Sequence, residues 1–257
     1  MISTQTNAYY YTNLRVHMGN LTASLFHKAS EVYAGRIRQR RILMKVLIAC
    51  EESQSVCKAF RSRGHEAYSC DIQECSGGRP EWHIQGDAIK EAYSGKYDLM
   101  VAHPPCTYLC CSGIRWLYNK DKSRNEDRWA SMYEALDFVQ ALMDAPIDKI
   151  AIENPISVIS SKIRKPDQII QPHHYGHPHK KSTCLWLKNL PLLIPTKHMD
   201  VEYKITSTGK KFSQWYWDTS ILPVAERAKA RSKTFDGIAQ AMADQWTRKY
   251  EQQQELL

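Results

Sequence analysis

The sequence predicts a mostly parallel, twisted α/β sheet with helices on both faces. From Lys45 onward, short apolar runs alternate with polar stretches of helical periodicity, which is the pattern of strands joined by crossover helices. Of the residues, 43% are hydrophobic and 24% are charged, a composition that is typical of a folded globular protein. A chain of 257 residues buries roughly 70–75% of its extended surface, so we expect one large domain with its own core.

The expected elements follow the chain in order. Before the first strand, apolar side chains near one face predict a basic helix at Leu21–Leu43. Short apolar runs predict strands at Val46–Cys50, Glu66–Cys70, Trp82–Ile84, Leu99–Ala102, Lys149–Ile152 and Cys184–Leu187. Helical spacing predicts helices at Val56–Gly64, Trp129–Met143 and Gly237–Tyr250. Between the last strand and the last helix, Val201–Ile205 and Phe212–Trp217 flank a glycine turn, which predicts a hairpin.

The charge of the chain is unevenly distributed. A total of 35 Lys and Arg against 27 Asp and Glu gives a formal net charge of +8, which favours a polyanionic partner. Residues 1–43 contribute +5 of this charge, since they hold six basic side chains and one acidic side chain. Two interpretations of this segment are favoured about equally: a dispensable extension ahead of a natural start at Met44, or an arm that binds nucleic acid. A third and less favoured interpretation is an acid-poor, Arg-bearing targeting peptide.

Nothing in the sequence predicts export or membrane insertion. No apolar run approaches the roughly 18 residues of a membrane span, and the N-terminus lacks the apolar segment of a secretory signal. We therefore expect a cytoplasmic protein with no membrane partner, in which the 8 Cys stay reduced. Neither the histidines from His173 to His179 nor the cysteines from Cys106 to Cys111 have the paired spacing of a structural zinc site, so we expect no metal.

Reactive side chains follow the predicted strands at the edge where open α/β sheets bind ligands. Cys106 stands in a Pro-Pro-Cys turn after the fourth predicted strand, and Glu153 follows the fifth. A thiolate is a nucleophile, and a neighbouring carboxyl group can protonate the ring that the thiolate attacks, a contribution of about 10²–10⁴-fold. The pair therefore predicts covalent catalysis on an electron-poor ring.

Four ordered segments carry a family resemblance. They are His103-Pro104-Pro105-Cys106, Ile152-Glu153-Asn154-Pro155, Tyr175–Lys181 and Arg231–Ala243. In this order they resemble the nucleophile motif, the Glu-Asn-Pro motif, the Tyr-Gly-x-Pro-Gln-Arg-Arg segment and the C-terminal motif of the DNA (cytosine-5)-methyltransferases, specifically of the short phage and prophage members. The resemblance runs from about Met44 to Tyr250 and implies a Rossmann-like class I methyltransferase fold.

The resemblance also implies what the residues do. Cys106 would attack C6 of a cytosine flipped out of double-stranded DNA, C5 would take the methyl group of S-adenosylmethionine, and Glu153 would clasp the N3/N4 edge. Cofactor contacts are implied for Glu51, Ser53, Asp71 and Asp87. Of these, Asp71 would hold the ribose hydroxyls and Asp87 the adenine amino group. Contacts with the substrate or the DNA are implied for Asn154, Lys181, Thr183, Lys210 and Lys211.

The resemblance divides the chain into four parts. Residues 1–43 form the basic N-terminal extension, 44–194 the catalytic domain, 195–225 a short hairpin recognition insert, and 226–257 a C-terminal helix that returns to the catalytic domain. Family members that read a defined sequence carry a much larger recognition domain. Either the target of this chain is short or loosely read, or another protein supplies the specificity. We expect the protein itself to be a monomer.

Departures from the family keep other functions open. The loop Glu51–Ser55 after the first strand has no glycine, although the family uses glycines there to bring the backbone close to the cofactor. Lys181 and Thr183 take the places of two arginines, and Lys lacks the planar guanidinium fork. The alternatives are a C5 methyltransferase of free pyrimidine nucleotides and a catalytically inactive relative that binds DNA.

Overall fold

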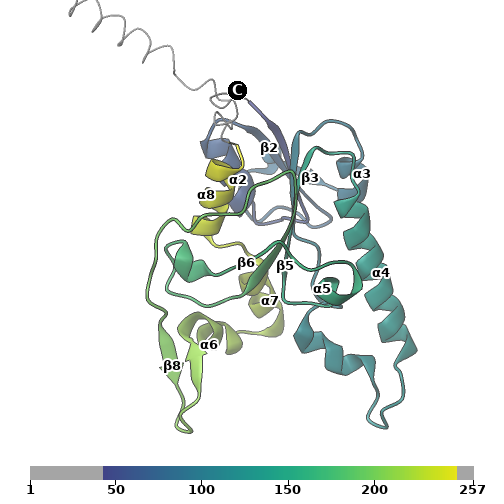
Figure 1. Ribbon diagram of the computed structural model, residues 1–257, viewed down its shortest axis with the longest axis vertical. Coiled ribbons are helices and arrows are strands. Elements are labelled where there is room, and N and C mark those ends of the chain that lie inside the picture. Colours follow the sequence, from purple (N-terminus) through teal and green to yellow (C-terminus); the bar gives the residue numbers. More distant parts are fainter. Residues whose placement is uncertain (1–42, 248–257) are drawn as a thin grey trace, which may run out of the picture. The chain divides into compact units, whose positions relative to one another are not determined.

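The structure, a computed structural model, describes residues 43–247 and places seven strands in one sheet (Figure 1). In chain order the strands are β1 (Lys45–Ala49), β2 (Glu66–Asp71), β3 (His83–Gln85), β4 (Leu99–Ala102), β5 (Lys149–Pro155), β6 (Gln168–Ile170) and β7 (Thr183–Lys188). Across the sheet their order is β3-β2-β1-β4-β5-β7-β6. The first strand, β1, therefore lies inside the sheet. The next two strands, β2 and β3, extend the sheet to one edge, and β4 to β7 form the other half.

The sheet is mostly parallel. All pairs from β3 to β5 are parallel, whereas β7 runs antiparallel to both β5 and β6. The predicted fold class, a Rossmann-like and mostly parallel α/β sheet with helices on both faces, is confirmed. The parallel strands β1 to β5 end at the same edge, where the loops that follow them carry the predicted site residues.

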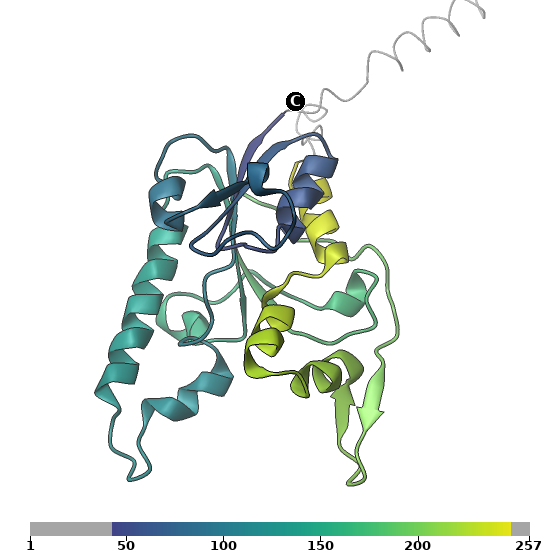
Figure 2. The same ribbon diagram turned by 180° about the vertical axis from the view of Figure 1, so that it is seen from behind.

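Helices cover both faces of the sheet because successive strand residues point to opposite sides. On one face, Val46 and Ile48 pack in a core with α2 (Ser55–Ser62) and α8 (Asp236–Gln245). On the other face, Leu47 and Ala49 share a core with the helices α3 (Ala88–Ala92) and α4 (Glu126–Met143). Figures 1 and 2 show α2 beside α8 on one side of the sheet and α3 with α4 on the other. Burial on both faces explains why residues 46–49 of β1 and all of β4 are apolar.

The remaining helices are short. They are the 3₁₀ helices η1 (Pro80–Trp82), η2 (Cys111–Leu117) and η3 (Pro172–His174), together with the α-helices α5 (Ile159–Lys162), α6 (Gln214–Ser220) and α7 (Val224–Ser232). The long helix α4 begins at a side-chain cap, since Asn125 accepts a hydrogen bond from the backbone of Arg128 at 3.2 Å. The predicted apolar stripe on α4 is buried at Met132, Leu136 and Val139.

The predicted hairpin is only partly right. Its strands are β8 (Tyr203–Ile205) and β9 (Lys211–Ser213), and the chain then turns into α6, so the strand predicted over Phe212–Trp217 is wrong. Contacts with later residues favour the helix: Arg231 lies over the ring of Tyr216 and donates to its backbone carbonyl at 3.1 Å. In this helix Trp215 and Trp217 do not share the face that strand alternation would give them. The next helix, α7, spans the predicted boundary at residue 225.

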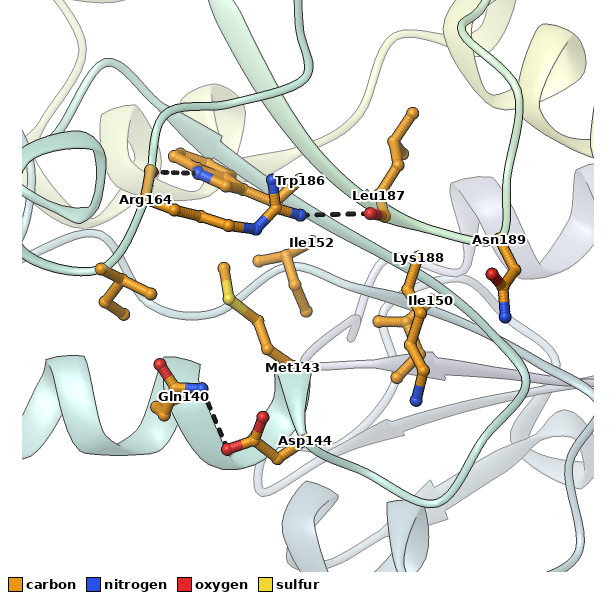
Figure 3. Close-up of a pocket in the computed structure, with 11 residues that line it drawn as sticks. Gln140, Met143, Asp144, Ile150, Ile152, Arg164, Trp186, Leu187, Lys188 and Asn189 are labelled. Atoms are coloured by element: carbon orange, nitrogen blue, oxygen red, sulfur yellow. Dashed lines mark hydrogen bonds between the residues drawn. The ribbon is translucent and has the colours of Figure 1, made fainter.

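A cavity of about 600 Å³ opens on the α4 side of the sheet (Figure 3). Its wall comes from the last turn of α4, from β5 and from β7, where the indole of Trp186 donates to the backbone carbonyl of Arg164 at 2.8 Å. The guanidinium of Arg164 in turn donates to the carbonyl of Leu187 at 3.1 Å. None of the predicted site residues lines this cavity.

Some predictions fall outside the described residues. The basic N-terminal extension and, apart from its last residue, the helix predicted over Leu21–Leu43 belong to this group, as does Tyr250 at the predicted end of α8. Within residues 43–247, none of the helices combines the length and the apolar character that crossing a bilayer requires.

Candidate functional site

Cys106 and Glu153 lie at the ends of two adjacent strands. β4 pairs in parallel with β5 in a register that sets Ala102 opposite Ile152. β4 ends there, whereas β5 continues to Pro155, and Glu153 pairs with Leu185 of β7. After β4, the backbone turns at Cys106, whose carbonyl accepts hydrogen bonds from the N–H groups of Leu109 at 3.0 Å and of Cys110 at 2.9 Å. The Cys106 side chain is half-buried and the Glu153 side chain is buried. Cys106 thus lies four residues beyond the end of β4, and Glu153, which was expected just after its strand, lies within the last part of β5.

Hydrogen bonds join the two loops beyond the strands. The amide of Asn154 donates to the carbonyl of Pro104 at 2.8 Å, and both residues are buried. Farther along, the N–H of Cys111 donates to the carbonyl of Ile156 at 3.3 Å, and the N–H of Val158 donates to that of Leu109 at 2.9 Å. These bonds fix the turn from Cys106 to Cys110, here called the cysteine turn, against the segment that carries Glu153.

Glu153 carries a negative charge although it is buried. Its Oε2 lies 3.0 Å from Nδ1 of His103, and the two side chains are 10% and 9% exposed. Burial is the largest influence on the pKa of Glu153 and raises it, but the hydrogen bond with His103 and the positive charge of Lys181 oppose burial. With a hydrogen bond from Thr183, they hold this pKa below its ordinary value. Since an ionised carboxylate only accepts hydrogen bonds, Nδ1 of His103 must be the donor.

The pKa of the Cys106 thiol depends on the thiol of Cys110. The turn places the two residues four apart with their thiols in hydrogen-bond contact, and this contact, followed by burial, raises the pKa of Cys106. The same contact is the largest influence on Cys110 and lowers its pKa, with further hydrogen bonds from Ser112 and the backbone of Gly113. The Cys110 sulfur lies 3.1 Å from the hydroxyl of Ser112. Cys110 therefore ionises before Cys106 and can accept the proton of its neighbour.

Asp71 and Asp87 lie together at the same edge of the sheet. Both charges raise the pKa of the thiol of Cys50 just after β1, although burial of this thiol has the larger effect. Asp71 uses Oδ1 to accept the N–H of Gln73 at 2.9 Å, and Asp87 uses Oδ1 to cap the first turn of α3. Within residues 43–247 the second oxygen of each carboxylate has no hydrogen-bond partner. Each aspartate can therefore accept from a hydroxyl or amino group of a ligand.

The other two predicted cofactor residues lie in the loop between β1 and α2. Glu51 is 5% exposed, and its two oxygens accept the N–H groups of Val56 at 2.7 Å and of Cys57 at 3.1 Å. Both oxygens of Glu51 thus bond the first turn of α2 rather than face a ligand. Ser53 is half-buried, with its hydroxyl 3.4 Å from that of Ser55.

The residues predicted to contact the substrate or DNA separate into an inner and an outer group. Asn154 and Thr183 are buried within the sheet edge. Lys181 is half-buried, and its ammonium group donates to a backbone carbonyl of α7 at 2.8 Å. Lys210 and Lys211 are exposed, Lys210 in the β8–β9 turn and Lys211 at the start of β9. Of the predicted set, the two hairpin lysines are the ones that a phosphate backbone can reach.

The histidines around η3 hold the C-terminal helix in place. Nε2 of His177 accepts the N–H of Gly237 at 2.9 Å at the start of α8. A Cβ added to Gly237 would lie 1.8 Å from the carbonyl oxygen of Tyr175, so only glycine allows this close approach. No three His, Cys, Asp or Glu side chains are arranged to hold a metal ion in the part of the chain that the structure describes.

Two residues of the site were not predicted from the sequence. In the sequence, His103 belongs to the segment that resembles the nucleophile motif, and Cys110 to the run of cysteines without zinc-site spacing. The available signal was position: a titratable residue directly at the end of β4, and a second thiol one helical turn beyond the first.

Comparisons with known proteins find similar chains among solved structures. No family model and no curated protein matches the chain. Among solved structures, the chain is similar to a triple mutant of DNMT2 from Spodoptera frugiperda, with 14% identity and a TM-score of 0.34 over 62% of this chain and 55% of that one. It is also similar to WbdD in complex with the kinase inhibitor LY294002, with 14% identity and a TM-score of 0.31 over 73% of this chain and 48% of that one. The chain spans about half the length of these structures.

Proposed function

We propose that this chain is an S-adenosylmethionine-dependent methyltransferase that acts on C5 of cytosine in double-stranded DNA. The observation that carries the proposal is the pairing of a half-buried thiol, Cys106, with a buried carboxylate, Glu153, at the ends of adjacent parallel strands. A thiol and a carboxylate so placed suit addition to a ring and protonation of the same ring. The resemblance of the segments around both residues to the DNA (cytosine-5)-methyltransferases supports the assignment.

In the proposed reaction the two residues act on opposite ends of the cytosine. The sulfur of Cys106 bonds to C6, and its proton passes to Cys110, which ionises first. Negative charge then develops toward N3, where Glu153 delivers a proton. Addition at C6 makes C5 nucleophilic. After C5 has been methylated its proton passes to water, and the electrons of the C5–H bond expel the thiolate of Cys106, which takes its proton back from Cys110.

Asp71 and Asp87 fit the cofactor by the chemistry of their free oxygens. A carboxylate oxygen beside Cys50 suits the vicinal hydroxyls of a ribose, and the exposed carboxylate that caps α3 suits an amino group on adenine. S-adenosylmethionine, when bound, supplies the methyl group that C5 receives. Ser53 stays in the proposed cofactor site as the hydroxyl of the preceding loop.

Covalent trapping tests the proposal. The protein is incubated with S-adenosylmethionine and duplex DNA that contains 5-fluorocytosine, and the products are separated by denaturing electrophoresis. Fluorine at C5 blocks proton loss, so we expect a covalent protein–DNA band that requires both the cofactor and Cys106. Cys106→Ala abolishes the band, whereas Cys111→Ala, at an exposed cysteine of the same segment, leaves it intact.

The same assay separates the alternatives. A wild-type protein that is folded by circular dichroism and gives no band contradicts the proposal. An adduct with 5-fluoro-deoxycytidine monophosphate but not with DNA would indicate a nucleotide methyltransferase. Salt-dependent retention on DNA without any adduct, and without binding of S-adenosylmethionine in calorimetry, would indicate an inactive DNA-binding relative.

A further inference from the structure

His103 lies in the candidate site, and the proposed attack of Cys106 on cytosine does not use it. It directly follows β4, and its backbone N–H donates to the carbonyl of Ala49 at 2.9 Å, which continues the pairing of β4 with β1. Its side chain is 9% exposed. Because the backbone is held by the central strands and the ring is buried, the sheet fixes the position of the imidazole relative to β5.

The two ring nitrogens of His103 have different surroundings. Nδ1 is hydrogen-bonded to Oε2 of Glu153 at 3.0 Å, while Nε2 is buried and has no hydrogen-bond partner within residues 43–247. A second buried carboxyl group, that of Glu51, is close enough for the charge of His103 to lower its pKa, although burial of Glu51 has the larger effect and raises it. Among the described residues, the carboxylate of Glu153 is therefore the hydrogen-bond partner with which the imidazole can exchange a proton.

Glu153 alone does not hold the proton that the proposed reaction consumes. Its pKa lies below the ordinary value, so the free protein carries the carboxylate form near neutral pH. A carboxylate can accept a hydrogen bond from the cytosine amino group, but it has no proton to give to N3. The proton must first reach Glu153 from a neighbouring donor.

We propose that His103 is this donor and transfers a proton to Glu153 during the attack on cytosine. The inference rests on the proposed function, because it names the source of a proton that this reaction takes up. The Nδ1–H bond of the imidazolium breaks as its proton moves to the carboxylate, and the carboxylic acid then gives a proton to N3. His103 becomes neutral while the ring gains one proton. When Cys106 leaves, N3 returns the proton by the same route, so no outside acid is consumed.

Other titratable and charged groups face the His103–Glu153 pair. Lys181, just ahead of β7, is a cation that lowers the pKa of Glu153, and the negative charge of Glu153 raises the pKa of the thiols of Cys106 and Cys184. Lys181 acts on Glu153 through its charge, and Glu153 acts on the two thiols in the same way. In the described part of the chain none of these three side chains is hydrogen-bonded to Glu153. The hydrogen bond with His103 provides the direct path for a proton.

His103→Asn tests the inference, because Nδ2 of Asn takes the place of Nδ1 and keeps the hydrogen bond while the transferable proton is lost. We expect adduct formation with 5-fluorocytosine DNA to slow by about 10²-fold at pH 7.5. The rate should recover as the pH falls, because solvent then protonates Glu153. A purely structural role for His103 would leave the rate and its pH profile as in the wild type, and this result would overturn the inference. His198→Asn, at an exposed histidine, is the matched control and should leave both unchanged.

A second measurement needs no DNA. In protein labelled with ¹³C at the Glu carboxyl carbons, the signal of Glu153 is assigned by its loss in Glu153→Gln and followed against pH. His103→Asn should raise the pKa of Glu153, because it removes the neighbouring positive charge; His103→Gln serves if the Asn variant does not fold. An unchanged titration would overturn the inference. A shifted titration, with a wild type that forms no adduct on any substrate, would overturn the proposed function and with it the relay, while leaving the coupling of the two side chains established.

Discussion

Asn154→Asp isolates the bond that holds the cysteine turn against β5. The change is isosteric, so it leaves no cavity, but it replaces the amide that donates to the Pro104 carbonyl at 2.8 Å by a carboxylate oxygen. Losing the donor leaves a buried carbonyl unpaired, at about 1–3 kcal/mol. A buried, uncompensated negative charge beside Glu153 brings the total to about 3–5 kcal/mol. With an m-value of about 2–3 kcal/mol per molar urea, the midpoint of unfolding at pH 8 should fall by roughly 1–2 M.

The loss should also depend on pH. A carboxyl group at this site has a higher pKa in the folded than in the unfolded protein, so its destabilising effect is absent below the unfolded pKa of about 3.9 and grows as the pH rises. Urea unfolding at pH 5 and pH 8, followed by circular dichroism, measures the difference. Asn119→Asp is the control, since the amide of this exposed residue also donates to a backbone carbonyl, at 3.3 Å, and its replacement should cost less than about 0.5 kcal/mol. Equal midpoints for Asn154→Asp and the wild type at pH 8 would refute the reasoning.

Three further predictions follow from contacts in the site and the hairpin. Gly237→Ala forces a Cβ into a backbone carbonyl and should cost about 1–3 kcal/mol, seen as a fall in the thermal midpoint; an unchanged midpoint would contradict the close approach. Cys110→Ala removes the largest influence that raises the pKa of Cys106, so alkylation of Cys106 by iodoacetamide should begin at a lower pH, and an unchanged pH profile would rule out the coupling. Replacing both Lys210 and Lys211 by Ala should reduce the salt dependence of DNA binding by a slope of about 2, and an equal slope would exclude them as phosphate contacts.

The sheet could be predicted where the sequence signal is local. β4 occupies Leu99–Ala102 as predicted, because four consecutive apolar residues between polar ones suit a strand that is buried on both faces. β6 was missed because it has three residues, one of them polar, at the edge of the sheet. The error at Trp215–Trp217 has a tertiary cause: alternating aromatics favour a strand, but contacts with α7 stabilise the helix.

The sequence predicts which residues of the site lie near one another, because strand order determines this, but it does not predict the hydrogen bonds between them. Cys106 and Glu153 come together because the carboxyl ends of the adjacent parallel strands β4 and β5 lie at the same edge of the sheet. The bonds that make the site specific join residues 50 positions apart, His103 to Glu153 and Pro104 to Asn154. These pairings depend on the register of β4 against β5 and on side-chain direction, and no local pattern encodes either. For the same reason the sequence could not show that both oxygens of Glu51 serve α2.

The loop Glu51–Ser55 after β1 turns sharply although it contains no glycine. Cys50 and Gln54 adopt positive φ angles of 58° and 59°, a conformation that costs non-glycine residues of order 1–3 kcal/mol. Hydrogen bonds of Gln54 with the backbone of Arg79, at 2.8 and 3.1 Å, hold this strained backbone. The close approach then occurs at Gly77, where a Cβ would lie 2.5 Å from Gln54 and 2.7 Å from the Ser53 carbonyl. Gly77 therefore permits the close packing of the loop after β2 against the loop after β1, and the side chain of Gln54 joins the two loops.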